Sequence, residues 1–431
     1  MSRTTLAGLA VFDGKLFFLN DSQGAGREVW VTDGTAAGTT LLADACPGDC
    51  SDSIGFLGGA GRIFYWIASQ DGAGNWQLWR SDGTRAGTQG DLRVDVAGSS
   101  SNATGATWAF VGDRLIFAGC RPGQGCEPWA TDGTDAGTVE LRPPPAGPGD
   151  YIDQLVSWKG KVYFFEIPTP GASSLWASDG STAGTVEVLS FPGNGAGLPP
   201  RFLSALADRL AFVIDGSLEE LWGSDGTTAG TLRLAGFADA DPIPGTGIFA
   251  LGGRAYLAAD DGVHGEEIWT SDGTVAGTRR ITDLALPAPF AFDRPLQMGL
   301  AGSRLVFVAA DSPGAFRLWK TDGTPGSTAP ISAVLPDKTS AFVPIEGRLV
   351  FPGSLPGHLA EPWATDGTAG GTAPLAGICH GSCELPVLVP VTVSGRLLFA
   401  IGDSLGSDLW TTDGTAAGTR RFTHTGTVQA S

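Results

Sequence analysis

The chain has 431 residues, of which 42% are hydrophobic and 17% charged, and this balance excludes an intrinsically disordered protein. Its formal net charge of −18 at pH 7 is the wrong sign for holding a phosphate backbone, so we predict no nucleic-acid partner. No apolar run is long enough to cross a bilayer, and the first residues lack the regions of a signal peptide. We therefore expect no membrane insertion, and any export signal to have been removed or never to have existed.

The first unit of the chain is expected to form four short strands, at residues 6–12, 15–19, 28–32 and 39–42. Asp13-Gly14 favours a tight hairpin between the first two strands, and a glycine-rich stretch at 22–26 separates the second from the third. Asp33-Gly34-Thr35 marks the third turn. A variable connection rich in Gly, Pro, Ser and Asp then leads to the next unit.

The same unit recurs nine times, at intervals of about 47 residues. Its most regular member is a tryptophan, found at Trp30, Trp79, Trp129, Trp176, Trp222, Trp269, Trp319, Trp363 and Trp410. Each unit also has a basic residue opening an apolar second strand, as in Lys15-Leu16-Phe17-Phe18 and Arg62-Ile63-Phe64-Tyr65. The predicted units span approximately 5–45, 54–95, 104–143, 152–190, 200–236, 246–283, 295–332, 340–376 and 387–424.

Four antiparallel strands in each of nine units predict an all-β fold, a nine-bladed β-propeller in which residues 1–431 form a single domain. A solenoid is the alternative, but four hairpin-connected strands do not stack into one naturally. The last unit ends with a fourth-strand pattern at 419–422, so we expect closure by packing of the ninth blade on the first. Whether the terminal residues add a strand is left open.

An aspartate starts the third turn of every unit, with Gly after it and a Gly-Thr pair five and six residues on in eight of the nine. These residues are Asp33, Asp82, Asp132, Asp179, Asp225, Asp272, Asp322, Asp366 and Asp413. A carboxylate there accepts backbone hydrogen bonds, which predicts a structural turn. The alternative is nine calcium sites, but one carboxylate per unit is too few oxygens. We predict no cofactor, no metal site and no catalytic residue among them.

The repeated tryptophan is predicted to pack in the core between blades, because a single large side chain at constant register is what such packing needs. A platform for a ligand is the alternative. The basic residue that opens the second strand is interpreted as an ion-pair partner or a solvated side chain. A ring of nine cations on one face is the alternative to that interpretation.

The six cysteines fall into three close pairs, Cys46 with Cys50, Cys120 with Cys126, and Cys379 with Cys383. Spacings of three to five intervening residues can close local disulfides, which predicts an oxidising compartment. Unpaired thiols and a metal site are the alternatives, the latter disfavoured because zinc ligands usually have shorter, equal spacings.

The phrase Glu28-Val29-Trp30-Val31-Thr32-Asp33-Gly34-Thr35 resembles the bacterial ELWxxDGT-repeat family, and all nine units carry a form of it. The resemblance implies an exported or surface protein without an established catalytic activity. The Ser/Thr-Asp-Gly-Thr turn also resembles the Asp-box hairpin of other propellers, although the tryptophan precedes it here. That second resemblance implies the fold alone.

The topology of a blade places the first and third hairpins at one end and the second hairpin and the connection at the other. All three cysteine pairs belong to the second, variable end, and specificity usually resides in variable loops on a rigid scaffold. We therefore predict a non-catalytic, monomeric, secreted or surface-displayed scaffold that binds a protein or a carbohydrate at that end or in the central channel. A polysaccharide-active hydrolase or lyase and a purely structural spacer are the alternatives.

Overall fold

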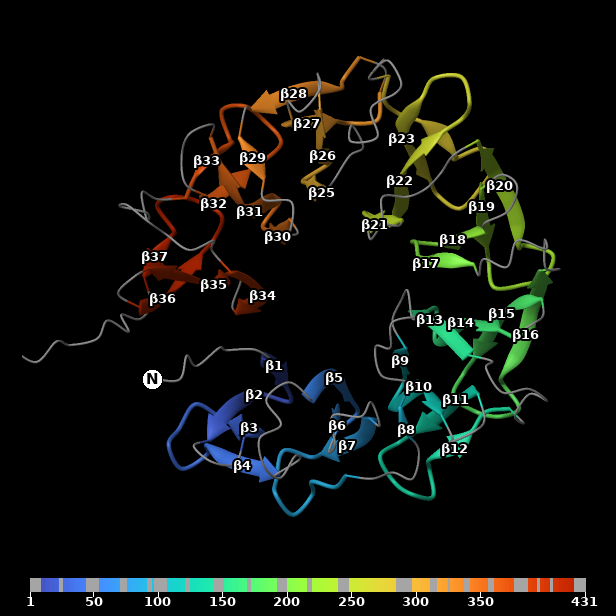
Figure 1. Cartoon of the computed structure of the whole chain (residues 1–431), viewed down its shortest axis with the longest axis vertical. Coiled ribbons are helices and arrows are strands. Elements are labelled where there is room, and N and C mark those ends of the chain that lie inside the picture. Colours follow the sequence, from blue (N-terminus) through green and yellow to red (C-terminus); the bar gives the residue numbers. More distant parts are fainter. Residues whose placement is uncertain are drawn as a thin grey trace, which may run out of the picture. The chain divides into compact units, whose positions relative to one another are not determined.

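The structure is a computed structural model, and it describes the strands and most of the tight turns of the chain (Figure 1). The described residues are 9–22, 26–43, 54–69, 76–90, 95–96, 107–120, 125–142, 151–168, 172–191, 200–214, 219–238, 248–283, 297–310, 316–324, 326–332, 334–336, 342–355, 360–375, 387–393, 396–403 and 406–421. Every regular element in these ranges is a β-strand. The strands form the nine antiparallel blades of a nine-bladed β-propeller, which confirms the predicted fold class.

The strands of the first five blades follow one another along the chain. Blade 1 consists of β1 (Leu9–Phe12), β2 (Lys15–Ser22), β3 (Gly26–Thr32) and β4 (Thr40–Ala43); blade 2 of β5 (Ile54–Ala60), β6 (Ile63–Ser69), β7 (Trp76–Ser81) and β8 (Asp95–Val96); blade 3 of β9 (Trp108–Val111), β10 (Arg114–Cys120), β11 (Cys126–Thr131) and β12 (Val139–Glu140); blade 4 of β13 (Tyr151–Trp158), β14 (Lys161–Ile167), β15 (Ser173–Ser178) and β16 (Val186–Phe191); and blade 5 of β17 (Arg201–Ala205), β18 (Leu210–Ile214), β19 (Glu219–Ser224) and β20 (Leu232–Phe237).

The remaining four blades repeat the pattern, with one additional strand. Blade 6 consists of β21 (Phe249–Leu251), β22 (Arg254–Asp260), β23 (Glu266–Ser271) and β24 (Arg279–Arg280); blade 7 of β25 (Met298–Ala301), β26 (Arg304–Ala310), β27 (Phe316–Thr321) and β28 (Ala329–Ser332); blade 8 of β29 (Leu335–Pro336), β30 (Val343–Ile345), β31 (Arg348–Ser354), β32 (Glu361–Thr365) and β33 (Ala373–Pro374); and blade 9 of β34 (Val387–Val393), β35 (Arg396–Asp403), β36 (Gly406–Thr412) and β37 (Arg420–Arg421).

The chain divides into two compact units, and the division runs through blade 5. The first unit comprises Met1–Ala205, Arg209–Ser217 and Trp222–Leu232, and the second comprises Leu206–Asp208, Leu218–Leu221 and Arg233–Ser431. Blades 1 to 4 thus belong to the first unit and blades 6 to 9 to the second. The expectation of one domain over the whole chain stays a prediction.

The turns at one end of the blades are tight because their residues tolerate positive φ. In the hairpin between β1 and β2, Asp13 and Gly14 have φ of 48° and 71°, the pattern of a type I′ turn. The glycine of every Asp-Gly turn between the third and fourth strands has φ of 80° to 91°. We call this end of each blade the turn end, and the end with the second hairpin the loop end.

Each pair of successive blades within a unit shares an apolar cluster. Between blades 1 and 2, Phe17 and Val31 meet Phe64 and Trp66. Comparable clusters join blades 2 and 3, 3 and 4, 4 and 5, 6 and 7, 7 and 8, and 8 and 9. Because both faces of a middle strand are covered, β14 is buried from Val162 to Ile167. Burial of both faces makes each blade depend on its neighbours.

Two short strands from the connections depart from the four-strand pattern. The strand β8 pairs with β7 of its own blade and also with β10, so blades 2 and 3 share one continuous sheet. In blade 8, β29 pairs with the end of β31 near Ser354. Both additions lie at the loop end. No helix that could cross a bilayer occurs in the described ranges.

Candidate functional site

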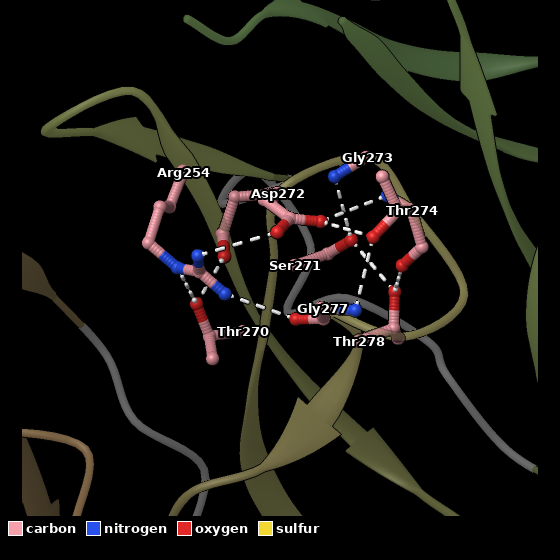
Figure 2. Close-up of polar contacts among 9 residues, drawn as sticks. Arg254, Thr270, Ser271, Asp272, Gly273, Thr274, Gly277 and Thr278 are labelled. Atoms are coloured by element: carbon pink, nitrogen blue, oxygen red, sulfur yellow. Dashed lines mark hydrogen bonds and ion pairs between the residues drawn. The ribbon is translucent and has the colours of Figure 1, made fainter. Parts of the chain in front are cut away.

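The repeated aspartate closes the turn between the third and fourth strands, as blade 6 shows (Figure 2). Asp272 Oδ1 accepts hydrogen bonds from the Thr274 N–H at 3.0 Å and from the Thr274 hydroxyl at 2.6 Å. The Thr274 hydroxyl also accepts from the Gly277 N–H at 3.0 Å. The Thr278 hydroxyl donates to the Thr274 carbonyl at 2.7 Å and lies 2.7 Å from the Ser271 hydroxyl. The hydroxyls and one carboxylate oxygen are thus engaged within the turn.

The same bond from the N–H two residues on to Oδ1 is present in all nine blades. It occurs at Asp33, Asp82, Asp132, Asp179, Asp225, Asp272, Asp322, Asp366 and Asp413, at 2.9 to 3.0 Å. Among the described residues, no three His, Cys, Asp or Glu side chains gather as metal ligands would. The expectation of no metal and no cofactor remains a prediction.

Blade 7 replaces the Gly-Thr pair with Ser327-Thr328, although its third and fourth strands pair in the same register as those of blade 6. The Ser327 hydroxyl lies 3.0 Å from the Thr321 hydroxyl and donates to the Thr324 carbonyl at 2.9 Å. These are the two bonds that the threonine one position later makes in the other blades. The hydroxyl therefore keeps its place although the sequence shifts by one residue.

The hydrogen bonds at the turns lower the pKa of each repeated aspartate below its ordinary value. For Asp272 the largest cause is the Thr274 hydroxyl, and for Asp322 the Thr324 hydroxyl, with the Ser327 hydroxyl next, lowers the pKa to about 2. A depressed folded-state pKa stabilises the fold above the unfolded-state pKa, and the stabilisation is lost as the pH falls through the folded value.

We expect the free energy of unfolding to fall as the pH is lowered below about 4, where the unfolded chain binds more protons than the folded chain. Urea denaturation at pH 7, 5, 4 and 3 measures this dependence. Asp272→Asn should flatten the curve slightly, because one of the nine titrating turns is removed. The control is Asp283→Asn, at a side chain that is 75% exposed and outside the turns. A stability that does not change between pH 5 and pH 3 contradicts the assignment.

Six of the nine repeated tryptophans lie on the face of their blade that meets the preceding blade. Trp79, Trp129, Trp176, Trp222, Trp319 and Trp363 belong to or pack against the cluster shared with that blade. Trp129 and Trp363 are buried. The rings of Trp30 and Trp410 stack on a cross-strand phenylalanine of their own blade, with centroids 6.4 and 6.5 Å apart. Trp269 packs edge-on against Phe237.

One of the three cysteine pairs lies in the described residues, and it is a disulfide. Cys120 ends β10 and Cys126 begins β11, directly opposite, with Cα atoms 4.1 Å apart. The short strand β8 pairs with Cys120 and with its neighbour Gly119, so the bridged hairpin is also joined to blade 2. The pairs Cys46 with Cys50 and Cys379 with Cys383 lie outside the described residues.

The basic residue of the second strand contacts a repeated turn. Lys15 Nζ donates to the Gly83 carbonyl, and Arg114 Nη1 to the Gly180 carbonyl, each at 3.2 Å and each in the following blade. Blade 2 corrects the sequence alignment. Phe64 pairs with Ser81 as Leu16 pairs with Thr32, so Ile63 occupies the Lys15 position and Arg62 precedes it by one residue.

In blades 5, 6 and 9 the arginine returns to its own turn instead, as Figure 2 shows for blade 6. Arg254 Nη2 donates to the Gly277 carbonyl at 2.9 Å, and Nε donates to the Thr270 hydroxyl at 3.2 Å. Its Nη1 lies 3.7 Å from Asp272 Oδ2. The guanidinium therefore does not reach the turn of blade 7, where Arg279 Nη1 instead donates to the Gly323 carbonyl at 2.9 Å.

A cleft of about 410 Å³ lies between blades 6 and 7 at their turn end. Its floor includes Ile281 and Leu305, which are 7% and 2% exposed. Polar groups surround the floor, and those that belong neither to a repeated turn nor to the bonded pair Arg254 and Thr270 are Tyr256, Arg279 and Ser303. None of these three matched the repeat pattern in the sequence. The packing of blade 7 beside blade 6 brings Ser303 to Tyr256 and Arg279.

No protein-family model and no curated protein matches the chain. Among solved structures, similar chains include a puromycin hydrolase at 18% identity (82% of this chain, 58% of that chain, TM-score 0.41) and a prolyl endopeptidase at 13% identity (84% and 54%, TM-score 0.42). TolB from Acinetobacter baumannii is 14% identical over 72% of this chain and 79% of that chain, with a TM-score of 0.30. The chain thus spans less than two thirds of the hydrolase and of the endopeptidase.

Proposed function

We propose that the chain is a non-catalytic binding module of an exported or surface protein, of the ELWxxDGT-repeat type, which holds a protein or glycan ligand at the loop end of its blades. The observation that carries the proposal is the disulfide between Cys120 and Cys126. It closes the second hairpin of blade 3, at the end where connections vary between units. Disulfides of this kind persist in oxidising compartments, which supports an extracellular location.

The surroundings of the disulfide support a rigid recognition surface. The strand β8 pairs with both β7 and β10, which ties the bridged hairpin to the neighbouring blade. A loop that is already ordered loses less conformational entropy when it binds a ligand. At the opposite end the turn hydroxyls and one carboxylate oxygen are engaged within each repeated turn, whereas the loop end carries the residues that vary between units.

The test compares the wild-type chain with the double variant Cys120→Ser/Cys126→Ser on a glycan array and a panel of extracellular matrix proteins. We expect saturable binding to at least one ligand, and binding at least tenfold weaker in the variant because the hairpin loses its order. The variant should also lose about 2 kcal/mol of stability, since a short loop is no longer constrained in the unfolded chain. Val275→Ala is the control, because Val275 is 59% exposed at the turn end.

Three results contradict the proposal. Equal binding by the double variant places the ligand elsewhere. New reducing ends after incubation with a bound polysaccharide indicate a hydrolase, and unsaturated sugar ends indicate a lyase. No binding on either panel favours the structural spacer.

A further inference from the structure

We propose that the cleft between blades 6 and 7 is a second binding site, which accepts one neutral hexose residue of a glycan. This goes beyond the loop-end function and does not depend on it, because the cleft lies at the opposite end of the blades. Its volume of about 410 Å³ falls within the range of small-ligand pockets. Geometry, unused hydrogen-bonding capacity and charge each support the assignment.

The cleft exists because the usual filling side chain is missing at this junction. At Gly83, Gly133, Gly180, Gly226, Gly367 and Gly414, a Cβ atom would find a side-chain atom of the preceding blade at 2.3 to 3.1 Å. At Gly323, the corresponding glycine of blade 7, the nearest such atoms are Arg279 Nη2 and Ile281 Cγ2, both at 3.9 Å. Arg254 is held on its own turn by three polar contacts, so the space beside Gly323 stays open.

Polar groups at the cleft retain capacity for a ligand. The hydroxyls of Tyr256 and Ser303 make no hydrogen bond to any part of the protein that the structure describes. Arg279 is exposed and uses Nη1 for the Gly323 carbonyl, which leaves Nε and Nη2 as donors. Two hydroxyls and a guanidinium edge around a small apolar floor match a sugar ring, which has hydroxyls at its rim and C–H groups on its face.

The charge of the lining favours a neutral ligand over an anion. The guanidinium groups of Arg254 and Arg279 are balanced by the carboxylates of Asp272 and Asp322, which also line the cleft. The hydrogen bonds at the turns lower the pKa of both carboxyls, so both are charged at neutral pH. An anionic sugar would meet two carboxylates, whereas a neutral hexose can accept from the arginine and donate to the acids.

The test is a titration of the full chain with glucose, galactose, mannose and their methyl glycosides, in which saturation-transfer NMR measures binding. Sodium glucuronate and sodium acetate serve as anionic probes. We expect saturable binding of at least one neutral hexose. Arg279→Ala and Ser303→Trp should each weaken it at least tenfold, the first by removing donors and the second by filling the cleft. Ser303 is exposed, so the second variant leaves the core intact.

The matched control is Arg348→Ala, which removes a basic residue beside Gly414 at a junction that is already filled. It should change the affinity less than twofold, and so should Cys120→Ser/Cys126→Ser. The proposal is overturned if no neutral hexose saturates the chain up to about 50 mM. It is also overturned if Ser303→Trp binds as well as the wild type, or if glucuronate or acetate binds more tightly than every neutral hexose. If the cysteine double variant loses binding on the glycan array but binds hexose normally, the loop-end site and the cleft are separate sites.

Discussion

Replacing Trp129 with alanine should lower the free energy of unfolding by about 3 to 5 kcal/mol, the usual cost of removing a buried aromatic ring. Trp129 is 8% exposed and belongs to the cluster shared by blades 2 and 3, where it packs with Phe117 and Leu78. A cavity there removes contacts from both blades at once. The measurement is the midpoint of urea unfolding, monitored by tryptophan fluorescence and by far-UV circular dichroism.

Two further variants make the Trp129 result interpretable. Trp129→Phe should recover part of the loss, because a smaller aromatic ring refills some of the cavity. Val263→Ala should be neutral, since Val263 is 80% exposed. If Trp129→Ala is no more destabilising than Val263→Ala but abolishes ligand binding, the tryptophan is a ligand platform and the core assignment is wrong.

The number and type of blades could be predicted because two independent signals recur together. The tryptophan marks the third strand of each unit, and the Asp-Gly turn that follows marks its end. The expected strands of the first unit agree with β1 to β4 to within a few residues. Side-chain chemistry decides these features locally, since a turn needs positive φ at its glycine and a strand needs apolar faces.

The alignment of Arg62 failed for a physical reason. A basic residue before an apolar run looks the same in sequence whether it opens the strand or ends the preceding turn. Cross-strand pairing fixes the register. Phe64 pairs with Ser81, the serine that precedes the turn, so Ile63 and not Arg62 stands one residue before that partner. Arg80 of β7 lies beside Gly133 instead, so the contact with the next blade comes from another strand. Pairing across strands is a tertiary property that a single repeat does not encode.

The cleft could not be predicted because the repeat is intact where it forms. Arg254 occupies the same pairing position as Arg114, one residue before the partner of the Ser or Thr that precedes the turn. Arg114 reaches the next blade, whereas Arg254 bonds to its own turn. The repeat predicts the residue type at this position, but it does not predict which of the two glycine carbonyls the guanidinium reaches. The own-turn contact recurs at Arg209 and Arg396, so the same repeat position adopts two arrangements.

The seventh blade supplies a natural comparison for the repeated glycine of the Gly-Thr pair. A Cβ atom on Gly277 would lie 2.0 Å from Asp272 Oδ1, and equally close contacts occur at the matching glycines of other blades. Blade 7 carries Ser327 at this position, and the glycine before it, Gly326, has a φ of 80°. Blade 7 thus accommodates a side chain here with a backbone that differs from that of the other turns at the preceding residue.

Gly277→Ala should destabilise the chain by about 2 to 3 kcal/mol, because the aspartate must leave its bonds to Thr274 or the turn must rearrange. Val275→Ala in the same turn is the control, since that side chain is 59% exposed. Thermal and urea midpoints measure the difference. A neutral Gly277→Ala would mean that the carboxylate does not occupy the space above this glycine, which contradicts the packing seen in the eight turns that carry the Gly-Thr pair. If Gly277→Ala destabilises the chain and Val275→Ala does not, the aspartate carboxylate needs the space that a Cβ atom on Gly277 would fill. This requirement explains why the Asp and the Gly recur together.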